Sequence, residues 1–225
     1  MNNKKNFFEP RVGQHYSEGI NGKKVLVVGT SIYCSKTDCI IYSQCTGPEK
    51  KDSSAFDTLC PEYKQSGSVL HDEPSNVWEN TDSRTLKNFT TSLQPYLVEV
   101  PADQVCEYFA FTEYIQYIIG APDGVTKPQH ISQRDFDAFV ETVKVLQPDV
   151  IIIWGCVINK PLVQGNLYVI DKAALPDSQH YISHMSLPGV DHTIPLLNCY
   201  HPSSSGWHSD FGIFAKYLKQ VLDTQ

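Results

Sequence analysis

Three short apolar runs, each closed by a turn residue, constrain the fold of this chain more than any other feature. They consist mainly of Val, Ile and Leu, and they cover residues 24–28, 150–154 and 194–199. Runs of this length without apolar–polar alternation are typical of strands buried on both faces of a parallel sheet. Gly29 and Gly155 close the first two runs. The dipeptide His201-Pro202 closes the third, because proline has no N–H with which to continue a sheet ladder. We therefore expect three parallel neighbours whose carboxyl ends share one edge of a sheet.

Two helical patterns accompany these runs. Ser132 and Asp135 form a capping-box pattern ahead of apolar residues at helical spacing, and Pro148 ends that pattern. A second helix is expected near the C-terminus, with Ser209 or Asp210 as its N-cap. Both helices follow polar turns, as helices that cover a sheet do.

Weaker patterns complete the fold prediction. They indicate a short helix around residues 86–93, a strand from about residue 105 to Phe111 followed by a turn or helix, and a weak strand near residues 181–185. This order of strands and helices predicts an α/β fold of three layers, a sandwich whose central sheet is mostly parallel.

The chain of 225 residues fits one domain with an insertion. We expect residues 1–23 to form an N-terminal arm that packs its aromatic side chains on the domain. Residues 24–225 should form a single α/β domain with a cysteine-rich insertion at about residues 34–63. No apolar run approaches the roughly 20 residues of a membrane span, and the N-terminus has no apolar signal core. The sequence therefore predicts a cytoplasmic protein without a membrane partner. It does not indicate an oligomeric state.

The net charge of −7 counts against tight, non-specific binding of a polyanion. It does not exclude a local basic face, because the first 24 residues hold five Lys and Arg residues against two Glu residues.

Clustered cysteines suggest a metal site. Four of the seven cysteines lie within 27 residues, and these are Cys34, Cys39, Cys45 and Cys60. In a cytoplasmic protein such clusters favour a metal over disulfides, and four thiolates can hold a structural zinc ion or an iron–sulfur cluster. Their spacing matches neither a zinc ribbon nor a ferredoxin, so free thiols or a redox pair stay open as alternatives.

Polar residues gather where the strands are expected to end. His201, Ser203 and Ser205 follow the third run, and Gly29 and Thr30 follow the first. In open α/β sheets ligands bind just beyond the carboxyl ends of the strands. We therefore expect a binding site at this edge.

A strand closed by Trp154-Gly155 and a later strand that runs into His201-Pro202-Ser203 together resemble the uracil-DNA glycosylase superfamily. In that family the last two central strands end in Trp/Leu-Gly and in an HPS motif, which a helix follows. Gly29 with Tyr33 resembles the family's first motif, a glycine-led loop that carries the water-activating acid. Phe111-Thr112-Glu113 resembles the segment in which an aromatic side chain stacks on the flipped base and an Asn reads its edge. The resemblance spans about residues 24–222.

This resemblance implies a DNA glycosylase-like hydrolase that cleaves the N-glycosidic bond of a damaged base flipped out of the stack. His201 would donate to O2 of the base and stabilise the negative charge left on it. Phe111 or Tyr114 would stack on the base. No cofactor would be required for the chemistry. Some branches of the family carry a four-cysteine iron–sulfur cluster, with the cysteines dispersed differently.

Two residues depart from the family pattern. Ser31 stands where the family has the Asp or Asn that holds the attacking water, and a neutral hydroxyl cannot support an oxocarbenium-like sugar as a carboxylate does. Glu113 stands where the family has the base-reading Asn, and a carboxylate only accepts hydrogen bonds. We therefore expect a base other than uracil.

Other interpretations stay open. Ser31 would permit a catalytically inactive protein that binds nucleic acid or nucleobases with the same fold. An unrelated α/β hydrolase is disfavoured, because the chain has no G-x-S-x-G elbow. His201 could be a structural hydrogen-bonding residue, and Glu113 could be a solvated surface acid.

Overall fold

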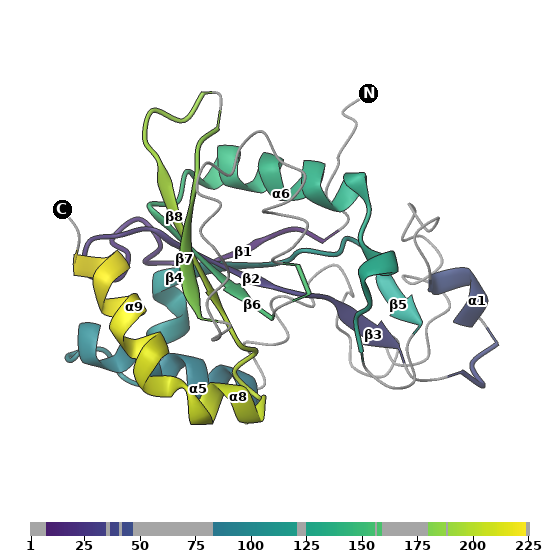
Figure 1. Ribbon diagram of the computed structural model, residues 1–225, viewed down its shortest axis with the longest axis horizontal. Coiled ribbons are helices and arrows are strands. Elements are labelled where there is room, and N and C mark those ends of the chain that lie inside the picture. The colour runs from purple at the N-terminus through teal and green to yellow at the C-terminus, as the bar shows by residue number, and fades with distance from the viewer. Residues whose placement is uncertain are drawn as a thin grey trace.

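The computed structural model describes residues 8–34, 37–40, 42–46, 83–120, 125–155, 157–158, 180–187 and 189–223. Among these residues the centre of the fold is a six-stranded sheet (Figure 1). In spatial order its strands are β1 (Arg11–Val12), β4 (Phe109–Glu113), β2 (Val25–Gly29), β6 (Val150–Trp154), β8 (Ile194–Cys199) and β7 (Tyr181–Met185).

The four inner strands are parallel and the two edge strands are antiparallel. β2 pairs with β6 and β6 pairs with β8, so the three apolar runs are the parallel neighbours that the sequence predicts. β4 joins them on the other side of β2, also in parallel. β1 and β7 close the two edges in the antiparallel direction. The mixed α/β architecture with a mostly parallel central sheet is therefore confirmed.

Each face of the sheet has its own apolar cluster, because successive side chains of a strand point to opposite faces. Ile152 packs with α5 (Arg84–Leu93) and α9 (Phe211–Asp223), on what we call the α5–α9 face. Its neighbour Ile153 packs on the opposite face with α6 (Gln133–Leu146). Figure 1 shows α6 on one side of the sheet and α5 and α9 on the other. The helices thus cover both faces and leave the carboxyl edge to loops.

α6 begins and ends where its sequence signals place it. Asp135 is buried, and its Oδ2 accepts a hydrogen bond from the Ser132 backbone N–H at 2.8 Å. Its Oδ1 accepts from the backbone N–H of Gln116 at 2.8 Å. Gln147 adopts a left-handed conformation (φ 45°) after the last turn. The carboxylate therefore ties the start of α6 to the segment that follows β4.

The chain turns sharply after β8 and enters two consecutive helices. The first is the short helix α8 (Ser205–Ser209), whose N-cap Ser204 accepts a hydrogen bond from the Trp207 N–H at 3.2 Å. α9 follows at Phe211, next to its expected N-cap position. The sequence did not predict α8. Its presence places a helical turn directly after His201 to Ser203.

The N-terminal residues pack against the sheet. Phe8 is fully buried, and its N–H donates to Gln116 Oε1 at 2.9 Å. Arg11 in β1 forms an ion pair with Glu107. These contacts join the arm to the β4 side of the domain.

A second, two-stranded parallel sheet lies beside the central one (Figure 1). It consists of β3 (Ile32–Cys34) and β5 (Ile118–Gly120). The remaining elements are α1 (Tyr42–Cys45) and the 3-10 helices η2 (Gln94–Tyr96), η3 (Val105–Tyr108) and η4 (Pro128–His130). Within the described ranges, none of the helices has the length and apolar character needed to cross a membrane.

Candidate functional site

The candidate site is the carboxyl edge of the sheet on the α5–α9 face. In register, Gly29 pairs with Glu113, and Trp154 pairs with Cys199. Phe111, Ile152 and Trp154 belong to the cluster on this face, so the alternation of side chains puts Gly29 and Glu113 on the same face. The last row of the sheet therefore runs Glu113, Gly29, Trp154, Cys199 across four parallel strands.

The carboxylate of Glu113 lies directly over Gly29. A Cβ atom added to Gly29 would lie 2.5 Å from Glu113 Oε2 and 2.7 Å from Oε1. The Glu113 residue is only 9% exposed, so it is not the solvated surface acid that the sequence left open. Burial of a carboxylate costs stability, and exceptions of this kind are expected at functional sites. Gly29 has no side chain, and this absence makes room for the Glu113 carboxylate.

The loops after β2 and β6 are joined at the same edge. Thr30 Oγ1 donates a hydrogen bond to the carbonyl oxygen of Trp154 at 2.7 Å. Gly155 has a φ of 95°, and a Cβ atom there would lie 2.6 Å from Thr30 Oγ1. The Gly155 N–H donates to the Cys199 carbonyl at 2.9 Å. The ends of β2, β6 and β8 are thus held in fixed relative positions.

His201 lies next to Trp154 and is oriented by Ser203. The His201 and Trp154 ring centroids are 6.0 Å apart, with the rings nearly perpendicular at 78°. His201 Nδ1 accepts a hydrogen bond from the Ser203 backbone N–H at 3.3 Å and lies 2.7 Å from Ser203 Oγ. Because a backbone N–H can only donate, Nδ1 is the acceptor nitrogen and the ring proton resides on Nε2.

Burial lowers the pKa of His201 below its ordinary value of 6.5. The imidazole is therefore neutral near pH 7. A neutral imidazole with its proton on Nε2 is a hydrogen-bond donor that keeps its proton when it binds an acceptor.

Ser31 and Tyr33 are connected to a segment that the sequence did not indicate. Ser31 Oγ and the Tyr33 hydroxyl each lie 2.5 Å from Thr126 Oγ1. Tyr33 is 37% exposed, and Ser31 is half-buried. Ser205 is exposed at the start of α8. Thr126 was not predicted, because its partners lie more than 90 residues away in the sequence.

The two aromatic residues expected to stack on a base lie in the core. Phe111 is 2% exposed and packs on Trp154 with ring centroids 5.4 Å apart. Tyr114 is 1% exposed and packs on Phe139 in the opposite layer. Tyr33, in β3, is 37% exposed and is therefore more accessible to a base than either of them.

Comparison with protein families finds no family that matches this chain. Comparison with curated proteins finds no match either. The geometry of the site is therefore the basis for a functional proposal.

Gln116 fixes the backbone position of Glu113 by a side-chain hydrogen bond. Its Nε2 donates to the Glu113 carbonyl oxygen at 2.5 Å, and its backbone N–H donates to Asp135. Gln116 is 2% exposed. No local pattern indicates this role of Gln116, because its partner Asp135 belongs to a different element, the N-terminus of α6.

Part of the predicted metal site lies outside the described residues. Cys34 and Cys39 are half-buried. The side chain of Cys45 and all of Cys60 are outside the described part of the chain. Within that part, no group of three or more His, Cys, Asp or Glu residues could hold a metal ion. The metal site stays a prediction.

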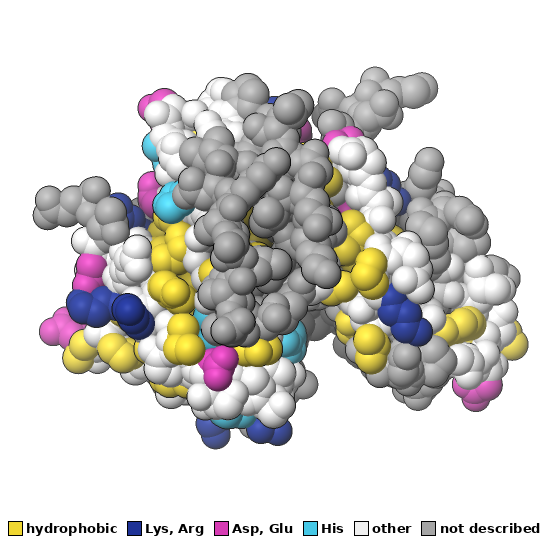
Figure 2. Space-filling view, viewed as in Figure 1, with side chains coloured by type: hydrophobic (Ala, Val, Ile, Leu, Met, Phe, Trp, Pro, Cys, Tyr) yellow, Lys and Arg dark blue, Asp and Glu magenta, His cyan; other side chains and the backbone are white. Residues whose placement is uncertain are grey.

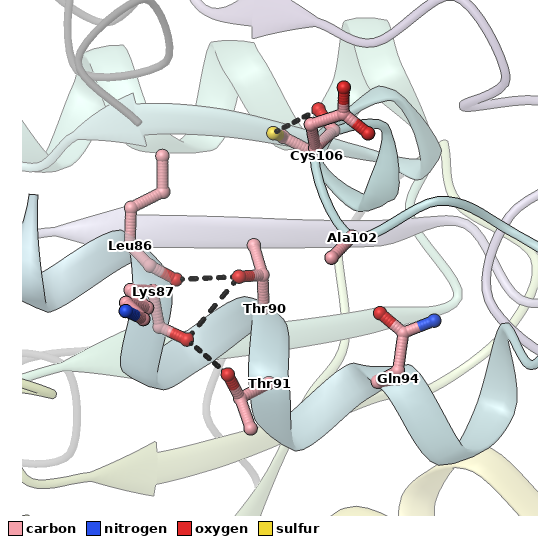
Figure 3. Close-up of a pocket in the computed structure, with 8 residues that line it drawn as sticks. Leu86, Lys87, Thr90, Thr91, Gln94, Ala102 and Cys106 are labelled. Atoms are coloured by element: carbon pink, nitrogen blue, oxygen red, sulfur yellow. Dashed lines mark hydrogen bonds between the residues drawn. The ribbon is translucent and has the colours of Figure 1, made fainter. Parts of the chain in front are cut away.

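A separate hollow of about 460 Å³ lies between α5 and the segment that leads into η3 (Figure 3). Its Thr90 and Thr91 hydroxyls donate to carbonyl oxygens of α5 at 3.0 and 2.6 Å. Burial raises the pKa of the Cys106 thiol, which keeps it protonated and unreactive. Because its hydroxyls donate within α5, this hollow is a weaker candidate than the sheet edge.

Proposed function

We propose that this protein is a DNA glycosylase-like hydrolase that cleaves the N-glycosidic bond of a damaged base flipped out of the stack. The observation that carries the proposal is His201. It is a neutral imidazole whose Nδ1 is occupied by Ser203 and whose Nε2–H is a donor. It lies at the carboxyl edge of the sheet, on the same face as the buried Glu113.

The chemistry follows from this donor. When the C1′–N bond breaks, the electron pair stays with the base, and negative charge develops on its oxygen and nitrogen atoms. A donor aimed at that charge stabilises the transition state more than the ground state. Water then adds to C1′ and loses a proton, and the base leaves as its protonated form. His201 keeps its Nε2 proton throughout, because loss of that proton would leave a buried anionic imidazolate, and burial disfavours the imidazolium that could pass a proton to the base.

A flipped base can reach this edge only from single-stranded DNA or after extrusion from a duplex. The distribution of charged side chains on the surface agrees with recognition of the base and not of the phosphate backbone. Lys and Arg side chains of the described residues lie in separate small groups among acidic and hydrophobic side chains on the face shown in Figure 2. The net charge of −7 also disfavours a broad phosphate-binding surface. No cofactor takes part in this chemistry, and a zinc ion or iron–sulfur cluster at the cysteines would be structural.

The test is base excision by the His201→Ala variant. The full chain is incubated with oligonucleotides that carry single damaged bases, and abasic sites are detected by alkaline strand cleavage. Loss of one such donor should lower the rate about 100- to 1000-fold. His208→Ala is the matched control, because His208 is exposed on α8 and its described contact is with Arg84 at 3.2 Å. Equal activity of the two variants would contradict the proposal.

One observation favours a second candidate, a catalytically inactive protein that binds nucleobases or nucleic acid. Ser31 is neutral, and its Oγ lies 2.5 Å from Thr126 Oγ1. It therefore offers no carboxylate for the attacking water. The same oligonucleotides distinguish the two candidates. A binding protein would retain oligonucleotides that carry the damaged base, and it would produce no abasic sites.

A further inference from the structure

We infer that the hydroxyl groups of Ser31, Thr126 and Tyr33 form a relay that carries a proton from the attacking water to solvent. Thr126 is a positioning residue in this relay, because it acts through Ser31. The inference rests on the proposed function and adds a path for the proton that this reaction releases. It follows from the contacts of the three hydroxyls and from their increasing exposure.

The three hydroxyls form a continuous chain with Thr126 in the middle. Thr126 Oγ1 lies 2.5 Å from Ser31 Oγ and 2.5 Å from the Tyr33 hydroxyl oxygen. A hydroxyl has one donor proton and two acceptor lone pairs, and its proton rotates toward the available partner. Thr126 can therefore accept a hydrogen bond from one neighbour while it donates to the other, in either direction.

The chain leads from the candidate site to solvent. Thr30, the residue before Ser31, donates through its hydroxyl to the Trp154 carbonyl at 2.7 Å. This contact holds Ser31 near the carboxyl edge of the sheet, where it is half-buried. Thr126 is half-buried as well, whereas Tyr33 is 37% exposed. The outer end of the chain therefore belongs to a residue that reaches solvent.

The small second sheet holds both sides of the contact at Thr126. Tyr33 lies in β3, which pairs in parallel with β5 (Figure 1). Thr126 lies just before η4, and the Tyr117 hydroxyl donates to the His130 carbonyl of η4 at 2.7 Å. Tyr117 is 3% exposed and directly precedes β5. The same sheet therefore carries Tyr33 and anchors the segment that bears Thr126.

The proposed reaction releases a proton that Ser31 cannot keep. The C1′–N bond breaks with its electron pair on the base, and the new C1′–O bond leaves a positive charge on the water oxygen. A carboxylate would hold the released proton, whereas a neutral hydroxyl accepts a proton only if it passes on its own. The water proton moves to Ser31 Oγ, the Ser31 proton to Thr126 Oγ1, the Thr126 proton to the Tyr33 oxygen, and the Tyr33 proton to solvent. The departing base takes up one proton from solvent, so atoms and charges balance.

Excision by Thr126→Val tests the relay, because valine keeps the shape of threonine and removes the hydroxyl. Oligonucleotides with one hypoxanthine, one uracil or one 7-methylguanine are incubated with the full chain, and the variants are measured on those that the unaltered protein cleaves. kcat should fall about 10- to 100-fold at unchanged KM, because the hydroxyl acts on the water and not on the base. Thr126→Ser should restore kcat. Thr91→Val, which removes an exposed hydroxyl that donates within α5 at 2.6 Å, is the matched control and should leave kcat unchanged.

A solvent isotope experiment measures proton movement separately from folding. When several protons move together, kcat depends non-linearly on the deuterium fraction in mixtures of H2O and D2O. This dependence should be curved in the unaltered protein and in Thr91→Val, and linear or absent in Thr126→Val. Tyr33→Phe should lower kcat and reduce the curvature, because the chain then ends at the half-buried Thr126. It replaces Thr126→Val if that variant does not fold, as judged by circular dichroism.

The outcomes separate the two proposals. If Thr126→Val matches Thr91→Val in kcat or in isotope dependence, the relay is overturned and the glycosylase proposal stands. A fall in kcat that Thr126→Ser does not reverse would mean that position 126 acts through its shape, and this result would also overturn the relay. If the unaltered protein excises none of the bases, both proposals are overturned.

Discussion

Gly155→Ala tests whether the loops after β2 and β6 are locked together as the structure indicates. Gly155 has a φ of 95°, which costs a residue with a Cβ atom about 1–3 kcal/mol. The new Cβ would also lie 2.6 Å from Thr30 Oγ1. It would displace the hydroxyl from the Trp154 carbonyl, which Thr30 contacts at 2.7 Å, at a further cost of about 0.5–1.5 kcal/mol. The free energy of unfolding should therefore fall by about 1.5–4.5 kcal/mol.

A second glycine separates the two costs. Gly189 has a φ of 87°, and a Cβ atom there would meet nothing within 4 Å. Gly189→Ala should therefore lose only the conformational part, about 1–3 kcal/mol. Urea unfolding followed by circular dichroism gives both values at constant m. In a Thr30→Ala background the clash at Gly155 is gone, so Gly155→Ala should cost about as much as Gly189→Ala.

The predicted contact between Thr30 and a Cβ atom at position 155 is contradicted if Gly155→Ala is no more destabilising than Gly189→Ala, or if the cost of Gly155→Ala is the same with and without Thr30. Either result would mean that Thr30 moves aside freely and that the edge is not held by its contact with Trp154. A coupling of about 1 kcal/mol between Thr30 and Gly155 is the expected value for groups in contact.

Four further measurements address other parts of the structure. Burial lowers the pKa of His180 and of His201, so below their ordinary pKa of 6.5 the unfolded chain binds more protons. The contribution of these two groups to the free energy of unfolding should be at its maximum above pH 6.5. It should decrease as the pH falls below 6.5, by at most about 1.4 kcal/mol per pH unit for each His. Urea unfolding between pH 7.5 and 5.5 measures this slope, which should be shallower in His201→Ala. Asp135→Ala should cost about 2–4 kcal/mol in thermal or urea unfolding, because two buried backbone N–H groups lose their acceptor. Asp137→Ala, on the partly exposed side of the same helix, should cost less than about 0.5 kcal/mol. Glu113→Asn should strengthen the binding of a uracil-containing oligonucleotide by about 1.5–3 kcal/mol, and an unchanged affinity would show that this side chain does not read the base. If the cysteine-rich insertion binds metal, elemental analysis should find one zinc ion per chain or iron with a brown colour, and a metal-free protein with full activity would leave the thiols without that role.

The sequence predicted the inner strands well where they are apolar throughout. Residues 150–154 pair as expected because a run of Val, Ile and Trp has no alternative way to bury both faces. A strand was predicted from about residue 105 to Phe111, but β4 begins only at Phe109, after the 3-10 helix η3, and continues to Glu113. The pairing of Glu113 with Gly29 extends this strand, and a polar residue at a strand end is indistinguishable from a turn when its partner is unknown.

The sequence could not predict which groups the side chains of the site contact. Ser31 was interpreted from its position after Gly29, but its contact is Thr126, on a segment 95 residues away. The helix α8 was missed because its N-cap, Ser204, stands in a run of three serines that equally suits a turn. The proton position on His201 depends on the Ser203 backbone N–H, which no residue pattern specifies. A local sequence pattern indicates which face of a strand or helix is buried and where the chain turns, whereas these contacts depend on the tertiary fold.

Under the proposed function, His201 and Glu113 would impose different demands on a substrate. His201 would stabilise charge on a departing base and would not distinguish between bases that carry an acceptor there. Glu113 would discriminate, because a buried carboxylate disfavours any base that turns a carbonyl oxygen toward it. Ser31 adds no negative charge near the sugar, so the rate of any excision would depend on how much of the barrier His201 removes from the departing base. A base that leaves readily as an anion should therefore be excised fastest, and a normal base should be bound more readily than it is cleaved.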